Sequence, residues 1–196
     1  IDILVAQGQL INRAAGAPEA AVEMNARLQS MLADIAKEEP DPEKAGPLMR
    51  SAMREEIALL PQAIMELIPE SQINDVAINT TVNQFNSPWF RFFLHYDPRP
   101  VLEQVSVPVL AISGEKDLQV PHDLNVPEIE AAFERGNNEA ATVRVLPGLN
   151  HLFQQAESGA PSEYQQIEET FNQSALELVS SWILKQFTSP KADTLN

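Results

Sequence analysis

Cysteine is absent from this chain of 196 residues. The absence excludes disulfide bonds, thiolate nucleophiles and cysteine-based metal sites together. It leaves the compartment open, because cytosolic and exported proteins can both lack cysteine. Long apolar runs are also missing: no stretch approaches the ~20 residues that a membrane-spanning helix needs, and no signal peptide is recognisable. The first residue is Ile1 rather than methionine, so we expect the chain to begin inside a longer protein.

Basic residues are few, and they are scattered. The chain has 13 Lys and Arg against 28 Asp and Glu, which gives a formal net charge of −15. Phosphate recognition needs clustered cations, so nucleic acid is not expected as a partner, and neither is an anionic membrane surface. Hydrophobic residues make up 44% of the chain, which is ordinary for a globular protein with a sizeable core.

Residues 1 to about 95 carry helical periodicity and little sign of strand. Between residues 20 and 39, apolar side chains recur at steps of three and four, which predicts one face of an amphipathic helix. These positions are Met24, Leu28, Met31, Leu32 and Ile35. Prolines then interrupt the pattern, and further helices are predicted at about 47–60 and 71–83. Such an array of short helices predicts a lid or accessory layer.

A dense aromatic segment leads into the second half of the chain. It contains Trp89, Phe90, Phe92, Phe93 and Tyr96. On a helix, Trp89, Phe92 and Phe93 would share one face. Two interpretations stay open for this face. It fills a core, or it lines an apolar substrate pocket between the lid and the body.

From Val105 onward the pattern changes to that of an α/β fold. The run "VPVLAIS" (107–113) predicts a strand buried on both faces of a parallel sheet, and "ATVRVLPG" (141–148) predicts a second strand. A helix at about 126–134, closed by Gly136, is expected between them. A closing helix over 174–187 has Ser174 and Glu177 at capping-box spacing and one apolar stripe, made of Leu176, Val179, Ile183, Leu184 and Phe187. This order is typical of a right-handed βαβ unit and its successor.

Two polar residues follow these strands at the edge where parallel sheets bind ligands. Asp117 comes after the first strand, and His151 comes after the second, 34 residues later. Because neighbouring parallel strands end at the same edge, we expect the two side chains to face each other. A carboxylate that accepts a hydrogen bond from one imidazole nitrogen fixes the tautomer and leaves the other nitrogen as a base. Such a pair is two-thirds of a triad that activates a serine.

Each of these residues also has an ordinary structural interpretation. An Asp in a turn after a strand commonly satisfies local backbone N–H groups, and a single His after Asn is often a surface or capping residue. The other two histidines, His95 in the aromatic segment and His122 beside Asp123, are interpreted as structural. No trio of His and carboxylates has the spacing of metal ligands, so a metal site is not expected.

Residues 87–121 and 146–183 strongly resemble the C-terminal part of serine α/β-hydrolases, and most of all the bacterial enzymes described as α/β-fold hydrolases or serine aminopeptidase-like esterases. The pattern P-V-L-x-I-x-G-E-x-D-x-x-V-P matches from Pro108 to Pro121, and P-G-x-N-H matches from Pro147 to His151. The resemblance implies that Asp117 is the acid and His151 the base of the family's triad. It covers about residues 86–185 with these motifs. It extends more loosely over the first half, which looks like the lid inserted after the sixth strand.

One part of the family's pattern is missing. These enzymes carry a G-x-S-x-G nucleophile elbow upstream of the acid, and none of the 7 glycines here forms one. The oxyanion hole that the family builds around the elbow is missing as well. We therefore expect a partial α/β-hydrolase fold, with a helical lid over 1–95 and then the C-terminal part of the core over 96–190, two parallel strands with flanking helices. A disordered tail is expected over 191–196. The localisation stays open between the bacterial cytoplasm and export.

The resemblance implies hydrolysis of an ester, thioester or amide through an acyl-enzyme, a reaction that requires neither a metal nor an organic cofactor. This chain would supply the acid and the base, act on a small-molecule acyl substrate, and be inactive without the serine. A competing hypothesis is a non-catalytic, hydrolase-like binding or interaction module, and a third is a small-molecule receptor. The strand at 107–113 would expose an unpaired edge, so we also expect a homodimer or a strand-swapped assembly.

Overall fold

The computed structural model describes residues 2–188 and has two compact units. The first unit spans Ile1–Asp97 and the second Pro98–Asn196, so the boundary falls two residues beyond the division expected after residue 95. The described residues contain many helices and a two-stranded parallel sheet, which agrees with the α/β class expected from the sequence. The tail expected over 191–196 lies outside the described residues.

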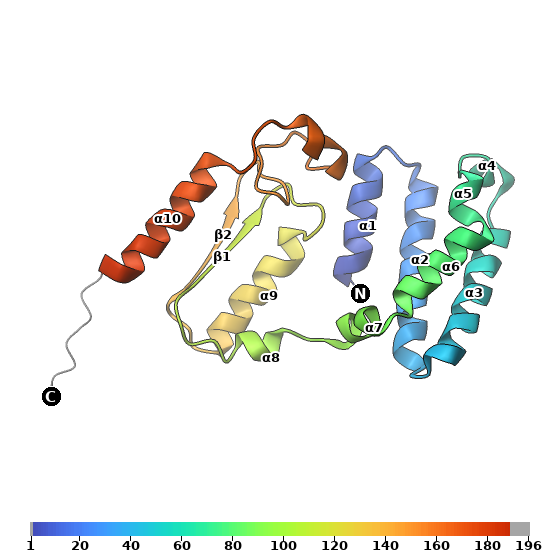
Figure 1. Ribbon diagram of the computed structural model, residues 1–196, viewed down its shortest axis with the longest axis horizontal. Helices are drawn as coiled ribbons and strands as arrows, with labels where there is room; N and C mark the ends of the chain where they lie inside the picture. Colours follow the sequence, from blue (N-terminus) through green and yellow to red (C-terminus); the bar gives the residue numbers. More distant parts are fainter. Residues whose placement is uncertain (1, 189–196) are drawn as a thin grey trace. The chain divides into compact units, whose positions relative to one another are not determined.

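The described part of the first unit is helical throughout (Figure 1). Its elements are α1 (Asp2–Ala14), α2 (Glu19–Glu38), α3 (Pro42–Ala58), α4 (Gln62–Met65), α5 (Glu70–Ile73), α6 (Asp75–Phe85) and α7 (Pro88–His95). Helix α1 packs beside α2, and α3 packs against both α2 and α6. Helix α7, the last helix of the unit, packs against α2.

The expected apolar face of α2 supplies much of the core of this unit. Met24 and Leu32 are buried, and Leu28 and Ile35 are half-buried against the same cluster. The buried cluster consists of Leu32, Ala33, Ala36, Ala45, Met49, Met53, Ile78, Val82, Phe85, Phe90 and Leu94. The helical spacing of apolar residues in α2 therefore located one wall of the core correctly.

Helix α3 begins at Pro42, and the start expected near Pro47 is wrong. The Oδ1 atom of Asp41 accepts the N–H of Glu43 at 2.9 Å, and Pro42 occupies the first helical position, where no N–H donor is needed. Pro47 then lies inside the helix, where it removes one backbone hydrogen bond without ending it. Helix α9 (His122–Arg135) likewise starts before Val126 and contains Pro127.

The second unit is built around two parallel strands (Figure 1). Its elements are α8 (Arg99–Leu102), β1 (Val109–Gly114), α9 (His122–Arg135), β2 (Ala141–Leu146), the 3-10 turn η1 (Pro161–Gln166) and α10 (Gln173–Thr188). The register runs from Val109 opposite Ala141 to Gly114 opposite Leu146. Helix α9 connects the strands and packs against both. The predicted strand–helix–strand order is confirmed.

Gly136 closes α9 as expected, but not by adopting the left-handed conformation. Its φ is −77°, and the following residue, Asn137, has the positive φ of 54°. A Cβ atom added to Gly136 would lie 2.3 Å from the carbonyl oxygen of Glu103. The glycine therefore allows the end of α9 to approach the segment that follows α8.

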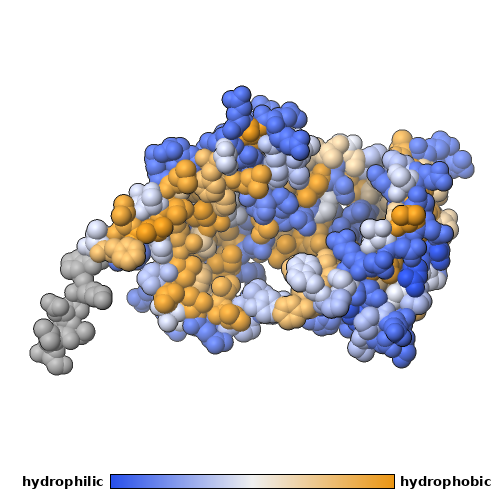
Figure 2. Space-filling model, viewed as in Figure 1, coloured by the Kyte–Doolittle hydropathy of each residue, from blue (hydrophilic) through white to orange (hydrophobic). Residues whose placement is uncertain are grey.

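The closing helix α10 differs from its prediction at its start. Its first turn is held by Asn172, whose Oδ1 accepts the Ser174 N–H at 3.0 Å, so Ser174 is inside the helix and does not act as the expected cap. Much of its apolar stripe is exposed, including Leu176, Ile183, Leu184 and Phe187, and only Ala175 is buried. Figure 2 shows hydrophobic residues gathered over α10 and the neighbouring strands.

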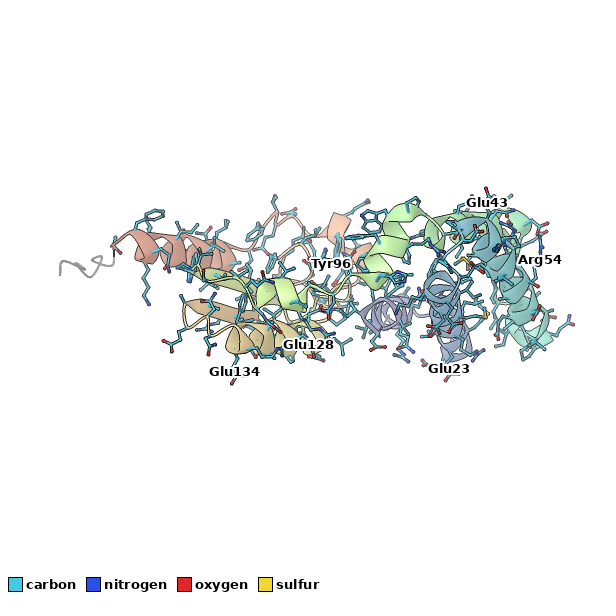
Figure 3. The ribbon with its side chains drawn as sticks, turned by 90° about the horizontal axis from the view of Figure 1, so that it is seen from below. Glu23, Glu43, Arg54, Tyr96, Glu128 and Glu134 are labelled. Atoms are coloured by element: carbon cyan, nitrogen blue, oxygen red, sulfur yellow. The ribbon has the colours of Figure 1, made fainter. Side chains whose placement is uncertain are left out.

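Acidic side chains occupy the outer faces of the helices in both units. Figure 3 shows Glu23 on α2, Glu43 on α3, and Glu128 and Glu134 on α9, all of which are exposed. Within residues 2–188, no helix combines the length and apolar character that crossing a bilayer requires.

Two neighbouring residues of α3 provide a test of the core of the first unit. Met49 is fully buried and Leu48 is 51% exposed. Met49→Ala should lower the free energy of unfolding by about 2–5 kcal/mol, because it leaves a cavity in packed surroundings, whereas Leu48→Ala should change it by less than about 0.5 kcal/mol. Urea unfolding followed by circular dichroism measures both values. Equal effects of the two variants would show that α3 is packed differently.

Candidate active site

Asp117 and His151 meet at the carboxyl edge of the sheet. Gly114 at the end of β1 pairs with Leu146 at the end of β2, so the loops that follow the two strands start side by side. The Nδ1 atom of His151 lies 2.9 Å from Oδ2 of Asp117. The juxtaposition expected from the order of the strands is therefore present in the structure.

The Asp117 carboxylate is fixed through both of its oxygens. Its Oδ1 accepts the backbone N–H groups of Gln119 at 2.9 Å and Val120 at 2.8 Å. Its Oδ2 is left for His151, and the residue is only 8% exposed. The structural and the catalytic interpretations of this aspartate are thus compatible, because one oxygen organises the turn while the other faces the imidazole.

The imidazole of His151 is anchored on one side and open on the other. A carboxylate only accepts hydrogen bonds, so the contact with Asp117 places the proton of the neutral ring on Nδ1. The Nε2 atom is then unprotonated, and it has no hydrogen-bond partner among residues 2–188. The side chain is 36% exposed. This arrangement is that of a base whose acceptor nitrogen can receive a proton from a group placed beside it.

The residue before the histidine, Asn150, organises the loop that carries it. Asn150 is fully buried, and its Oδ1 accepts the N–H groups of Leu152 at 2.9 Å and Gln154 at 3.0 Å. Its Nδ2 donates to Oε1 of Gln154 at 2.9 Å. Neither residue has a role predicted from the sequence, although Asn150 stands directly before His151 in the P-G-x-N-H motif.

Hydrogen bonds to backbone groups join the loop after β1, which carries Asp117 (the acid loop), directly to the loop after β2, which carries His151 (the histidine loop). The N–H of Lys116 donates to the carbonyl of Leu149 at 2.9 Å, and the N–H of Gly148 donates to Oε2 of Glu115 at 2.8 Å. The ammonium group of Lys116 donates to the carbonyl of Ala156 at 2.7 Å. Because these bonds cross between the loops, the separation of Asp117 and His151 is set by the backbone as well as by their own contact.

A second carboxylate braces the far end of the histidine loop. Glu163 accepts the N–H groups of Glu157, Ser158 and Gly159 and the hydroxyl of Ser158, at 2.7–3.2 Å. Desolvation raises the pKa of this carboxyl, but the hydrogen bonds, led by the Ser158 N–H, outweigh it and hold the pKa below its ordinary value. Next to it, burial raises the pKa of Tyr164, whose hydroxyl accepts from Nε2 of Gln119 at 3.0 Å.

The aromatic residues proposed to line a substrate pocket are on an exposed face of α7. Trp89 is 69%, Phe92 64% and Phe93 48% exposed, so the alternative that this face fills a core is wrong. Phe90 and Leu94, on the opposite side of α7, enter the core instead. Trp89 and Phe93 stack with ring centroids 5.6 Å apart. Their role toward a substrate stays a prediction.

The remaining histidines have local partners. The Nδ1 atom of His95 lies 2.7 Å from the carbonyl oxygen of Arg91, one turn earlier in α7, and Nδ1 of His122 lies 2.9 Å from Oδ1 of Asp123. Among residues 2–188, no group of three His or acidic side chains is arranged to hold a metal ion.

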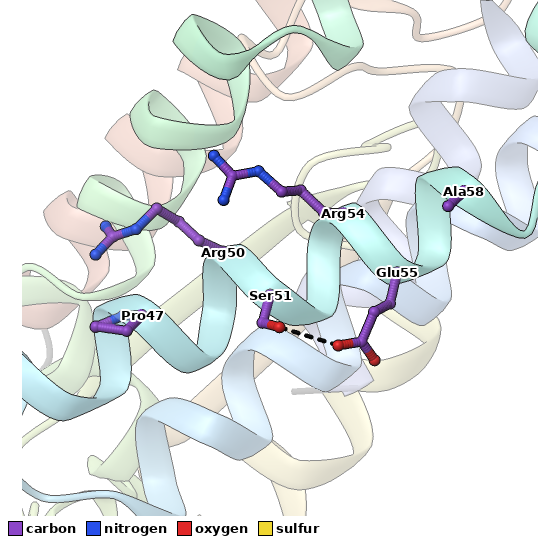
Figure 4. A pocket seen from close by; sticks show the side chains of 6 residues that line it. All are labelled: Pro47, Arg50, Ser51, Arg54, Glu55 and Ala58. Carbon is purple, nitrogen blue, oxygen red and sulfur yellow. Dashed lines mark hydrogen bonds between the residues drawn. The ribbon is translucent and has the colours of Figure 1, made fainter.

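A groove along α3 in the first unit contains a serine but no histidine that could activate it. It is lined by Pro47, Arg50, Ser51, Arg54, Glu55 and Ala58 (Figure 4). The Ser51 hydroxyl donates to Glu55 at 2.9 Å, and Arg54 is paired with Asp75 at 2.8 Å. The serine therefore faces a carboxylate without an imidazole, and one of the two guanidinium groups is already neutralised.

Comparison with known proteins gives no relative: no family model, no curated protein and no solved structure matches this chain.

Gly114, at the end of β1, lies very close to the loop that carries His151. A Cβ atom there would lie 2.3 Å from the carbonyl oxygen of Leu149 and 2.6 Å from that of Asn150. Gly114→Ala should therefore separate the two loops and destabilise the second unit by about 1–3 kcal/mol. Hydrogen exchange of the β1 and β2 amides measures the change.

Gly46→Ala is the matched control for this variant, because the nearest atom to its added Cβ is Nδ2 of Asn86 at 3.4 Å. That helical position should be stabilised or unaffected by alanine. Unchanged protection of both strands in Gly114→Ala would mean that the close approach of the two loops is not required.

Proposed function

We propose that this chain carries the acid and the base of a serine hydrolase that acts on ester, thioester or amide bonds through an acyl-enzyme. Asp117 is the acid and His151 the base. The serine and the oxyanion hole come from sequence that this chain does not contain. The observation that carries the proposal is the 2.9 Å contact between Oδ2 of the buried Asp117 and Nδ1 of His151 at the carboxyl edge of two parallel strands.

In the proposed reaction, Nε2 of His151 takes the proton from the serine hydroxyl as the oxygen attacks the acyl carbon. Asp117 keeps the ring in the required tautomer and stabilises the imidazolium that forms. The proton then passes to the leaving group, and a water molecule repeats the sequence to release the acid. The open side of the His151 ring supports this order of events, because Nε2 must face the incoming serine.

The exposed aromatic face of α7 supports a substrate with an apolar part. Trp89, Phe92 and Phe93 present uncharged ring surface, and such surface favours an acyl or leaving group that can be removed from water. A non-catalytic binding module would not require a carboxylate that divides its oxygens between a turn and an imidazole. The geometry of Asp117 thus favours the hydrolase over that alternative.

The activity test compares the two aspartate–histidine pairs of the second unit. The proposal expects a G-x-S-x-G segment to be encoded upstream of this chain, and the longer protein to hydrolyse p-nitrophenyl acyl esters. In that protein, Asp117→Asn should lower kcat about 10⁴-fold and His151→Ala about 10⁶-fold. This chain by itself should show no turnover above that of free imidazole, because the nucleophile is missing.

The pair formed by His122 and Asp123 is the matched control, because its nitrogen and oxygen are also 2.9 Å apart. Asp123 is 80% exposed on the first turn of α9, so Asp123→Asn and His122→Ala should leave kcat within about twofold. An upstream sequence without a serine elbow, or Asp117 and His151 variants that keep their turnover, would contradict the proposal.

Self-association through β1 is a second part of the proposal. The segment 107–114 has no charged residue, whereas β2 carries the exposed Arg144. Charged side chains on an edge strand discourage strand addition, so the edge of β1 is the more receptive of the two. Two copies related by a two-fold axis pair β1 with β1 in antiparallel fashion, since both strands then contribute the same edge.

The net charge of −15 opposes this association, and salt screens the repulsion. Sedimentation velocity should therefore show more dimer at 500 mM than at 50 mM NaCl. Val107→Lys, next to β1, should abolish the dimer, whereas Val101→Lys in α8 should not; the two valines are 62% and 52% exposed. A single species of 21.7 kDa under all conditions would overturn this part of the proposal without affecting the hydrolase assignment.

A further inference from the structure

The helical first unit contains a cavity of about 390 Å³ that the proposed chemistry does not use. Its inner wall is made by residues of the buried core, including Leu32, Met53, Phe85 and Phe90. Side chains from α1 and from the segment around α5 complete the lining. A dry cavity of about 150 Å³ holds a benzene molecule, so this space corresponds to a ligand of roughly fifteen non-hydrogen atoms by the same ratio.

Apolar and polar surface share the lining about equally, and none of its residues is charged. Five of the lining side chains are amides: Gln7, Asn25, Gln29, Gln72 and Gln84. The absence of charge is distinctive, because the acidic and basic residues of this unit are numerous and all lie elsewhere. A charged ligand would enter without a counter-ion, which costs far more than burying a neutral polar group.

One of the amides has an unsatisfied hydrogen-bonding atom. Among the described residues, Oε1 of Gln29 is the buried side-chain oxygen or nitrogen without a hydrogen-bond partner. Such orphaned atoms are rare in native structures and are costly unless something pairs with them. Rotation about the last side-chain bond of Gln29 exchanges its oxygen and nitrogen, so the amide can offer an acceptor or a donor to a bound molecule.

A glycine keeps space for this amide. Gly8 lies in the interior of α1, where glycine weakens a helix by about 1 kcal/mol relative to alanine. A Cβ atom at this position would lie 2.9 Å from both Oε1 and Nε2 of Gln29. The sequence thus places a poor helix former where the side chain of the unsatisfied amide lies.

We infer that this cavity binds a neutral amphipathic small molecule, with an apolar chain of about ten carbons against the core and an uncharged hydrogen-bonding head on Gln29. A fatty primary amide has this chemistry, since its head carries both N–H donors and a carbonyl acceptor. The inference goes beyond the proposed hydrolysis. All residues of the cavity belong to the first unit, so the test of ligand binding is independent of the roles of Asp117 and His151.

The five methionines of the chain make the test residue-specific. Met24 and Met53 line the cavity, whereas Met31 and Met65 do not. Decanamide titrated into the protein with ¹³C-labelled methionine methyls should shift the NMR signals of Met24 and Met53 saturably at micromolar concentration, and leave Met31 and Met65 in place. Decanoate, which has the same chain with a charged head, should bind at least tenfold more weakly at pH 7.5.

Variants separate occupation of the cavity from adsorption to exposed apolar surface. Gln29→Leu should weaken decanamide binding about fivefold to tenfold by removing the amide contact. Thr81→Phe should abolish binding by filling the cavity, and its neighbour Thr80→Phe, which is exposed and outside the lining, should not. Circular dichroism confirms that each variant is folded.

Three results would overturn the inference. These are equal shifts of all five methionine signals, decanoate binding as tight as decanamide, and undiminished binding in Thr81→Phe. Absence of any saturable shift up to the solubility limit of decanamide would do so as well.

Discussion

The hydrogen bond between Asp117 and His151 depends on two strands ending at the same level. Gly114 and Leu146 are partners in the register, so the acid and the base, distant in sequence, begin from adjacent points. The loops are then joined by backbone bonds such as that from Lys116 to Leu149. Because backbone geometry sets the separation, the site needs no large buried side-chain core of its own to bring the two groups together.

The second unit contains two aspartate–histidine contacts of equal length, and they differ in what surrounds them. Asp123 is 80% exposed, so water competes for its oxygens and its contact with His122 is worth little. Asp117 is 8% exposed and receives two backbone N–H groups. A carboxylate held in this way cannot rotate away from the ring. The contact distance is therefore the same in the two pairs. Only Asp117 is buried and has its other oxygen, Oδ1, bonded to two backbone N–H groups, which distinguishes the pair at the sheet edge.

The sequence was most informative where structure is determined locally. Apolar runs located both strands, and the parallel order placed Asp117 beside His151. The start of α3 was misjudged at Pro47, because a proline inside a helix can be outweighed by a cap six residues earlier, at Asp41. Periodicity left the orientation of α7 undetermined, since aromatic side chains lie on both of its faces and only packing decides that Phe90 is buried and Trp89 exposed. The role of Asn150 depends on loop contacts that spacing does not encode.

The two units bury apolar surface to different extents, and this bears on the site. The first unit has one continuous core, in which alanines are outnumbered by larger side chains such as Leu32, Met49 and Phe85. Among residues 98–188 of the second unit, the large buried apolar residues are Phe133 and Leu149, and the others are alanines. Much of the stripe of α10 is exposed, and the described residues provide no partner for the free edge of β1. Since hydrophobic burial is the main source of stability, whatever covers these surfaces also determines how firmly the strand ends, and with them Asp117 and His151, are held.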